Sequence, residues 1–389
     1  MESEEIIVSI SCITYNHAPY IRECLDGFMM QKTNFAFEVL IHDDASTDGT
    51  ADIIREYEAK YPDVIKPIYE EENQWVKGRR GSAVFNFPRA KGKYIALCEG
   101  DDYWTDPLKL QKQVDFLESH PDYVMCSHRF KLYNQAEQTF KSDWYTNVIS
   151  DVVYDLKTLI NGFWYHHPLS VIFRNSALHI DIYNSYPIHM DAVLFFHLLK
   201  KGKGVLLNED WAVYRIHRGG IWSMATRNNQ LKQEFIARLG ICKIEHTKDA
   251  ASFLRTQFTK DISRKWMIKE CKIMFKTFCI MSKYLGFLST LRIFGNKIFF
   301  TCKQSNINIK NTTTDTMILL FLFINFILSH PSTIIIHYAI VFFQFTLLFV
   351  NYFSSSISIS IAILGFADPR DAFITCPIRY FIALSCPVL

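Results

Sequence analysis

Short runs of apolar, β-branched residues alternate with stretches of helical spacing along the first third of the chain. Four of these runs predict buried strands: 6–13, 37–41, 64–69 and 94–97. The segments between the first three have an apolar residue at every third or fourth position, as an amphipathic helix does. Strands that alternate with helices at this pitch are typical of βαβ units. We therefore expect an α/β fold with a doubly wound, mostly parallel sheet and flanking helices.

The same alternation continues, less regularly, to about residue 225. It predicts a helix over 107–119, a strand over 123–130, a helix over 151–160, a strand over 171–174 and a helix over 192–199. The adjacent histidines 166 and 167 precede the last of these strands. Neighbouring residues of a strand point to opposite faces, so a metal shared by this pair is disfavoured, and we expect them at the edge of a cleft.

Carboxylates cluster directly after the strand at 94–97. Glu99, Asp101 and Asp102 follow that strand within five residues, at the end where open α/β sheets bind ligands. Their mutual repulsion would be relieved by a divalent cation, and Mg²⁺ or Mn²⁺ prefers oxygen ligands. The alternative is a solvated acidic turn that caps the helix beginning near Pro107.

Two other predicted strands also end in polar loops. Thr14-Tyr15-Asn16-His17 follows the first strand, and the second leads into the acidic turn 42–50, which contains Asp44. Each motif alone is weak, because such loops are often only turns or helix caps. Three of them at successive strand ends predict one shared ligand-binding edge.

These three motifs together resemble the signature of inverting family 2 glycosyltransferases of the GT-A fold, of the type that builds bacterial cell-surface polysaccharides. The resemblance covers about the first 130 residues and continues more weakly to Ser223. It implies that Tyr15 stacks on the nucleobase and that Asp44 accepts a hydrogen bond from the base. It also implies that Glu99 and Asp101 bind the ribose hydroxyls and the groups that surround the metal's direct ligands. It also implies that Asp101 or Asp102 binds Mn²⁺ or Mg²⁺ directly. The family more often has aspartate at position 99, which leaves the division of roles among the three carboxylates open.

A second acidic site is expected at Asp191, just before the apolar helix 192–199. The resemblance makes this residue the general base that takes a proton from the acceptor hydroxyl, a role worth about 10²- to 10⁴-fold in rate. A plain helix N-cap is the alternative interpretation of Asp191, and Asp210 is the rival acid.

The loop that follows residue 213 resembles the family segment that closes over the diphosphate. Here Arg215 and Arg218 are candidates for pairing with phosphate oxygens, and His217 for completing the metal or phosphate shell. A buried structural histidine at a strand end is the alternative for His217.

Composition changes the picture only beyond residue 225. Eleven lysines or arginines and two acids lie between 255 and 303, interleaved with aromatic residues, which favours an anionic membrane surface over nucleic acid because no nucleic-acid motif accompanies them. No Asp, Glu, Lys or Arg occurs over 316–367, so 334–353 is a candidate membrane span, with a disordered tail as the alternative. The acidic N-terminus predicts no signal peptide, and the ten cysteines without metal spacing predict reduced thiols in the cytosol.

The sequence therefore predicts three regions: a glycosyltransferase domain over 1–225, a basic helical, membrane-associating region over 226–310, and an apolar tail over 311–389. Within the first, 1–130 would bind the nucleotide and 131–225 the acceptor. We expect inverting, metal-dependent transfer from a nucleoside diphosphate sugar, with UDP as the nucleotide, to a saccharide or lipid-linked acceptor at the inner face of the membrane. A nucleotidyltransferase acting on sugar phosphates and a non-catalytic sugar-nucleotide or glycan-binding protein are the alternatives.

Overall fold

The computed structural model describes residues 5–79, 81–145, 147–186, 190–220 and 222–258, with 277, 280–286, 289–290 and 293 beyond them. Most of the basic region after residue 258 and the whole candidate span at 334–353 lie outside the described residues. Among the residues that are described, no helix has both the length and the apolarity needed to cross a membrane.

The described chain begins as an alternation of strands and helices and then becomes less regular. In chain order the elements are β1 (Ile6–Thr14), α1 (Ile21–Met29), β2 (Ala36–Asp43), α2 (Thr50–Lys60), β3 (Ile65–Tyr69), η1 (Ser82–Asn86), η2 (Phe87–Arg89), β4 (Tyr94–Leu97), β5 (Tyr103–Trp104), α3 (Lys109–Ser119), β6 (Tyr123–Asn134), β7 (Thr139–Ser142), β8 (Val152–Tyr154), α4 (Leu156–Ile160), η3 (Pro168–Ser170), β9 (Ile172–Arg174), α5 (Asn175–Leu178), α6 (Ile180–Asn184), α7 (Asp191–Leu199), β10 (Lys203–Ile216), α8 (Arg227–Glu245) and α9 (Lys248–Phe258).

The strands form one mixed sheet in the order β3-β2-β1-β4-β9-β6-β10-β5, with β7 beside β6 and β8 beside β10. Strands β1 to β4 are parallel to one another. Strand β9 runs against both β4 and β6, so β6 and its parallel neighbour β10 point the same way as β1. The α/β fold with a largely parallel main sheet is thus confirmed.

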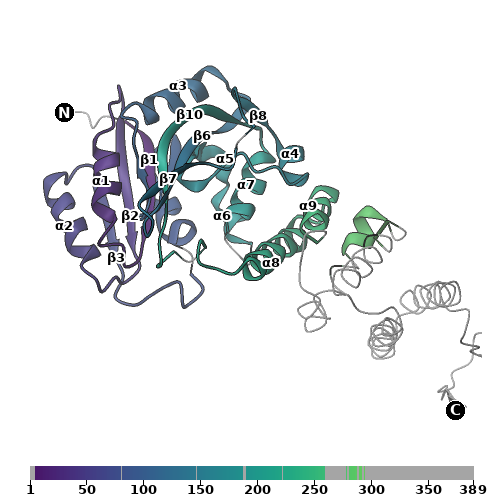
Figure 1. The fold of residues 1–389 in the computed structure, drawn as a ribbon. Helices are drawn as coiled ribbons and strands as arrows, with labels where there is room; N and C mark the ends of the chain where they lie inside the picture. Colours follow the sequence, from purple (N-terminus) through teal and green to yellow (C-terminus); the bar gives the residue numbers. More distant parts are fainter. Residues whose placement is uncertain are drawn as a thin grey trace, which may run out of the picture. The chain divides into compact units, whose positions relative to one another are not determined.

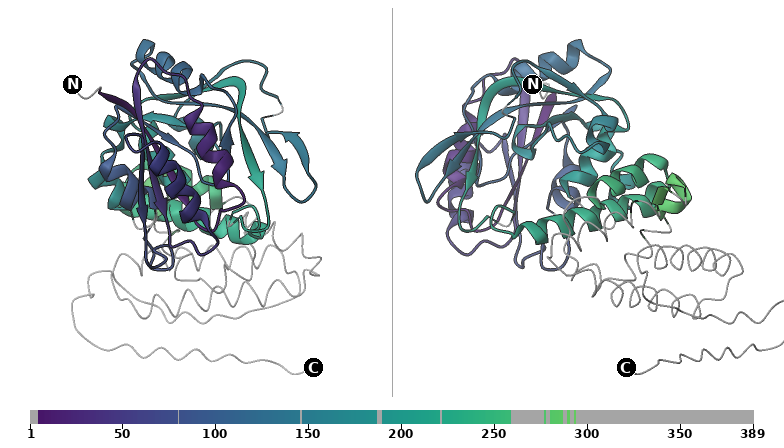
Figure 2. Two further views of the ribbon diagram at one scale, coloured as in Figure 1. Left: turned by 90° about the vertical axis from the view of Figure 1, so that its left-hand side faces the viewer. Right: turned by 45° about the vertical axis from the view of Figure 1, so that its right-hand side comes forward.

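Helices cover both faces of this sheet. In Figure 1, α1 and α2 lie on one side of the strands β1 to β3, and α5, α6 and α7 lie on the other side of the sheet. Helices α8 and α9 pack against each other, and they lie side by side in both views of Figure 2. The core between the layers is apolar: Ile10, Phe28, Ile95, Phe173 and Phe196 are completely buried.

Two segments differ from the sequence-based expectation. The expected helix over 151–160 is wrong in its first part, because Val152–Tyr154 forms strand β8 along Gly204, Val205 and Leu206 of β10. β-branched residues fit this pleated edge, and the helix α4 begins only after Asp155, whose side chain accepts a hydrogen bond from the Thr158 amide at 2.8 Å. The second difference is the short π-helix η1, because no helix or strand is predicted between residues 69 and 94.

Glycines allow two close approaches beside β1. A Cβ on Gly92 would lie 2.5 Å from the backbone nitrogen of Ser9, and one on Gly100 would lie 2.7 Å from Oγ1 of Thr14. Both positions therefore require the absence of a side chain so that the segments flanking β4 can pack against β1.

Candidate active site

Four loops that follow parallel strands meet at one edge of the sheet. Because β1, β2, β4 and β10 point the same way, the residues after their carboxyl ends lie on a common side. These loops carry Tyr15 and His17, Asp44, Glu99 to Asp102, and His217. The shared edge predicted from the three acidic and aromatic motifs is present, and β10 adds a fourth contribution to it.

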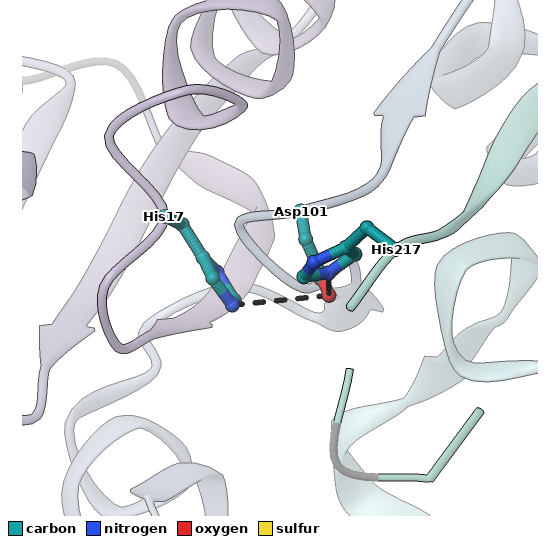
Figure 3. Close-up of side chains that lie close together, drawn as sticks. All are labelled: His17, Asp101 and His217. Atoms are coloured by element: carbon teal, nitrogen blue, oxygen red, sulfur yellow. Dashed lines mark hydrogen bonds and ion pairs between the residues drawn. The ribbon is translucent and has the colours of Figure 1, made fainter. Parts of the chain in front are cut away.

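Three side chains at this edge form a group that could hold a metal ion. His217 Nε2 lies 3.0 Å and His17 Nε2 lies 3.8 Å from Oδ2 of Asp101. One ligand atom from each of the three residues falls within 4.8 Å of the other two. Figure 3 shows the two imidazoles converging on the carboxylate from the loops after β1 and β10.

The chemistry of these three groups fits a divalent cation. Burial opposes ionisation of Asp101, but the hydrogen bond with His217 and the charge of His17 together leave its pKa below the ordinary value. Burial lowers the pKa of His17, which favours the neutral imidazole that binds metals. Oδ1 of Asp101 is buried and has no hydrogen-bond partner among the described residues, and such an atom can serve as a second ligand atom of the carboxylate. Imidazole nitrogen and carboxylate oxygen are both ligands of divalent metal ions, and this donor set does not by itself select one of them.

His17 was not among the metal ligands expected from the sequence. The loop that carries it is fastened to the loop after β2: the amide of His17 donates to Oγ1 of Thr50 at 2.8 Å, and the amide of Asn16 donates to Oγ of Ser46 at 2.8 Å. Asn16 has a φ of 54°, a left-handed conformation that asparagine tolerates. One signal in the sequence could have identified His17: it is a histidine that follows the carboxyl end of a strand, at the sheet edge where the acidic loop after β4 was also expected.

Asp102, an expected metal ligand, lies apart from this group. It is 2% exposed, and its Oδ1 accepts a hydrogen bond from the backbone amide of Arg215 at 2.8 Å. Burial raises its pKa well above the ordinary value, and the neighbouring charge of Asp101 adds to the shift. In this arrangement the carboxyl group of Asp102 joins the acidic loop to strand β10.

Arg215 was expected to pair with phosphate, but its guanidinium is engaged within the protein. Its Nε donates to the carbonyl oxygen of Asp101 at 2.9 Å, Nη1 donates to Oε1 of Gln135 at 2.8 Å, and Nη2 pairs with Glu23. The residue is 5% exposed. Arg215 therefore fastens the loop of Asp101 and Asp102 to β10. Of the two arginines, Arg218 is the exposed one and keeps its side chain open to a ligand.

Glu99 and Asp191 form a second pair of acids near the same edge. Desolvation of the two carboxyl groups raises the pKa of Glu99 to about 8 and that of Asp191 to about 6, although both residues keep exposed surface. The charges of Asp101 and Asp191 contribute to the shift at Glu99, so the candidate base on α7 is within electrostatic reach of the acidic loop. Asp191 is the first residue of α7 and no side-chain cap is formed by the preceding Met190, so the plain N-cap interpretation is not supported.

The expected nucleobase residues are carried by the loops after β1 and β2. Tyr15 is 42% exposed, so one face of its ring is available for stacking. Asp44 is nearly buried, and its two carboxylate oxygens accept hydrogen bonds from the amides of Gln74 at 2.6 Å and Trp75 at 3.1 Å. A carboxylate has about four acceptor positions, so Asp44 keeps capacity for one more donor. The rival acid Asp210 is exposed on β10 beside Tyr103 and Lys131.

Comparison with known proteins identifies a matching family model and several similar proteins. Residues 9–181 match the family model described as Glycosyl transferase family 2. An uncharacterized protein of Mycobacterium tuberculosis is 40% identical over 223 residues, which is 56% of this chain and 61% of the relative, so the chain spans about three fifths of that relative's length. A Bacillus subtilis protein named for teichuronic acid biosynthesis, TuaG, is 28% identical over 63% of this chain and 96% of its own.

A shorter match and a solved structure add to this. The Escherichia coli UDP-Glc:alpha-D-GlcNAc-diphosphoundecaprenol beta-1,3-glucosyltransferase WfaP is 32% identical over 32% of this chain and 46% of its own length. The structure of S. aureus TarS residues 1–349 in complex with UDP aligns with a TM-score of 0.53 at 15% identity, covering 77% of this chain and 92% of that one. This likeness shows a common fold.

Proposed function

Because residues 9–181 of the chain belong to glycosyl transferase family 2, we propose that the protein transfers a sugar from a nucleoside diphosphate sugar to an acceptor hydroxyl. The observation that carries the proposal is the grouping of a metal-binding set, His17, Asp101 and His217, with an acidic residue, Asp191, whose charge reaches the same loop. Such an arrangement supplies both requirements of the reaction, a site for the leaving diphosphate and a base for the attacking hydroxyl.

We propose UDP as the nucleotide. Tyr15 offers a ring face to the base, and Asp44 is held by two amides with acceptor capacity left for a ring N–H such as that of uracil. WfaP, the E. coli relative, carries UDP-glucose in its name, and the TarS structure of the same fold contains UDP. Exposed Arg218 is close in sequence to His217 and is available for a phosphate oxygen.

The metal proposal assigns the ligands to His17, Asp101 and His217 in place of Asp102. A divalent cation bound there would balance charge on the diphosphate as the nucleotide leaves. Arg215 and Asp102 position the set, since both fasten the acidic loop to β10. Glu99, whose carboxyl is partly exposed beside them, is proposed to hold hydroxyls of the nucleotide sugar.

Asp191 is proposed as the general base of an inverting reaction. A carboxylate with a pKa of about 6 is ionised at neutral pH and is a stronger base than an ordinary aspartate, which suits proton removal from a hydroxyl. The hydroxyl oxygen forms a bond to the anomeric carbon while the bond to the diphosphate oxygen breaks on the opposite face. The proton passes to Asp191, and the product carries the inverted configuration.

We propose a saccharide, carried on a lipid at the inner membrane face, as the acceptor. TuaG is named for a cell-surface polymer, and the name of WfaP specifies a diphosphoundecaprenol-linked sugar. The basic composition between residues 255 and 303 supports attraction to anionic lipid headgroups.

A panel of UDP-sugars incubated with the protein tests the proposal. We expect UDP to accumulate in the presence of Mn²⁺, to stop accumulating with a chelator, and to remain low in an Asp101→Asn variant. Release of pyrophosphate would instead establish a nucleotidyltransferase, and nucleotide binding without turnover of any donor or acceptor would establish a binding protein. The anomeric configuration of the product, read by NMR, tests inversion.

A further inference from the structure

A row of aromatic rings leads away from the candidate active site along the second half of the sheet. We call it the aromatic strip; its members are Tyr214, His167, Trp144, Tyr145, Tyr165 and Phe163. Successive ring centroids are close: 4.7 Å from Tyr214 to His167, 5.6 Å from His167 to Trp144, 5.8 Å from Trp144 to Tyr145, 6.1 Å from Tyr145 to Tyr165 and 6.2 Å from Tyr165 to Phe163. Rings at these separations support one another as a single packed surface.

One end of the strip lies at the reacting groups. Burial raises the pKa of the Tyr214 hydroxyl, and the negative charges of Asp102, Glu99, Asp101 and Asp191 raise it further. The charge of Asp101 also reaches His167, although burial dominates there and lowers its pKa to about 3. The geometry agrees with this, because Tyr214 directly precedes Arg215 on β10, and the amide of Arg215 donates to Oδ1 of Asp102 in the acidic loop at 2.8 Å.

The rest of the strip is open to solvent at two large apolar side chains. Trp144 is 46% exposed and Phe163 is 56% exposed, whereas Tyr145 between them is buried. The planes of Phe163 and Tyr165 are parallel to within 2°. Trp144 and Phe163 are thus the two exposed rings of the strip, and exposed aromatic side chains of this kind are enriched where proteins bind ligands.

Trp144 directly follows one partner of an ion pair, Asp143, which pairs with Arg129. Its neighbour Asp143 is 2% exposed and receives two hydrogen bonds from Arg129, from Nε at 3.1 Å and from Nη2 at 2.9 Å. The same carboxylate accepts from the amides of Phe130 at 3.3 Å and Tyr145 at 2.9 Å. A solvent-exposed tryptophan with so firmly fixed a backbone is preorganised for a ligand, because little freedom remains to be lost on binding.

We propose that the aromatic strip is the binding site for the saccharide part of the acceptor, with the accepting hydroxyl at the Tyr214 end and preceding sugar residues stacked on Trp144 and Phe163. The proposal rests on the proposed glycosyl transfer. A sugar ring presents C–H groups that its oxygens polarise, and these fit the negative face of an aromatic ring. Tyr165 and Tyr214 are only partly buried, and their hydroxyls supply polar partners for sugar hydroxyls, which an aliphatic chain would leave unsatisfied.

The test measures binding of defined probes to the full chain by saturation-transfer difference NMR, which detects ligand protons close to the protein. The probes are the methyl β-glycosides of cellobiose, lactose and N,N′-diacetylchitobiose, with 1-hexanol as the aliphatic comparison. For at least one glycoside, we expect Trp144→Ala to weaken binding about five- to tenfold, the range for loss of one aromatic contact. Trp144→Phe, which keeps a ring, should retain most of the affinity, and Phe163→Ala should weaken it in the same direction.

Phe140→Ala is the matched control. Phe140 is 57% exposed on β7 and its ring contacts Tyr133, outside the strip, so this variant should bind glycosides as the wild type does. The proposal is overturned if no glycoside binds the wild type, if Trp144→Ala binds as tightly as the wild type, or if hexanol shows the same dependence on Trp144. The last result would assign the strip to an aliphatic chain.

Nucleotide binding separates this proposal from the proposed function. Stabilisation by UDP with Mn²⁺ should be the same in all four variants, since the strip does not include the nucleotide residues. If UDP with Mn²⁺ did not stabilise the wild type, that result would count against glycosyl transfer itself. Normal UDP stabilisation together with unchanged glycoside binding in Trp144→Ala would remove only the acceptor assignment.

Discussion

Replacing Asp191 by asparagine keeps the shape of the side chain and removes its ability to take a proton. The neighbouring carboxylates stay in place, and Ala192 to Leu199 continue to bury the apolar face of α7. We therefore expect a folded protein whose turnover of a UDP-sugar and acceptor falls by about 10²- to 10⁴-fold, the usual contribution of a general base. Donor affinity should change little, because the nucleotide residues lie after other strands.

The pKa of Asp191 also predicts how the rate of the wild type changes with pH. With a pKa of about 6, Asp191 is about nine-tenths ionised at pH 7 and about one-tenth ionised at pH 5. The base is active when ionised, so kcat/KM should fall about tenfold between pH 7 and pH 5. An aspartate with an ordinary pKa would still be about nine-tenths ionised at pH 5, and the rate would then be nearly constant over this range.

The assay is UDP release followed from pH 5 to pH 8 at saturating Mn²⁺, for the wild type, Asp191→Asn and Asp210→Asn. Asp210 is an exposed acid on β10 and its replacement removes the same charge, so this control should keep the wild-type rate and pH profile. A flat wild-type profile, or an Asp191→Asn variant with full turnover, would refute the assignment. Loss of activity in Asp210→Asn alone would transfer the role to Asp210.

Three further measurements test other parts of the structure. His17→Asn should weaken Mn²⁺ binding, measured by electron paramagnetic resonance, at least about tenfold. The control His246→Asn, at an exposed position with a φ of 52°, should bind Mn²⁺ as the wild type does. Equal affinities of the two variants would exclude His17 as a ligand. Gly92→Ala should lower the free energy of unfolding in urea by about 1–3 kcal/mol, because the new Cβ meets backbone atoms of β1 that cannot move aside; an unchanged midpoint would contradict this contact. Burial lowers the pKa of Lys109 to about 7, so between pH 7 and pH 9 the unfolded chain binds more protons than the folded protein. The free energy of unfolding should therefore rise by about 1 kcal/mol per pH unit over this range. The rise should be absent in Lys109→Met, and if it persisted there, another group would be its cause.

The parts of the fold that could be predicted from the sequence are those set by local pattern. Residues 6–13 and 94–97 are apolar runs bounded by polar turns, and both are buried strands of the sheet. The 151–160 segment failed because its Val-Val-Tyr run is stabilised by pairing with β10, a partner about fifty residues away that local spacing does not reveal.

The candidate site shows the same division between local and distant information. The carboxylates after β4 were found because several acids follow one strand, but the sequence could not separate their roles. That separation comes from tertiary contacts: Asp102 meets the amide of Arg215, whereas Asp101 meets the imidazole of His217. The contacts of Arg215 could not be foreseen for the same reason, since its partner Glu23 lies on α1, far earlier in the chain.

The order of the proposed metal ligands along the chain has a consequence for biosynthesis. His17, Asp101 and His217 follow the first, fourth and last strands of the described sheet, and β9 must insert between β4 and β6 before that sheet is continuous. Chains fold from the N-terminus as they leave the ribosome. When only the first 180 residues have left the ribosome, the nascent chain therefore contains two of the three proposed ligands. The full set can bind the ion only after β10 has emerged. Prematurely terminated chains would leave synthesis without a complete metal site.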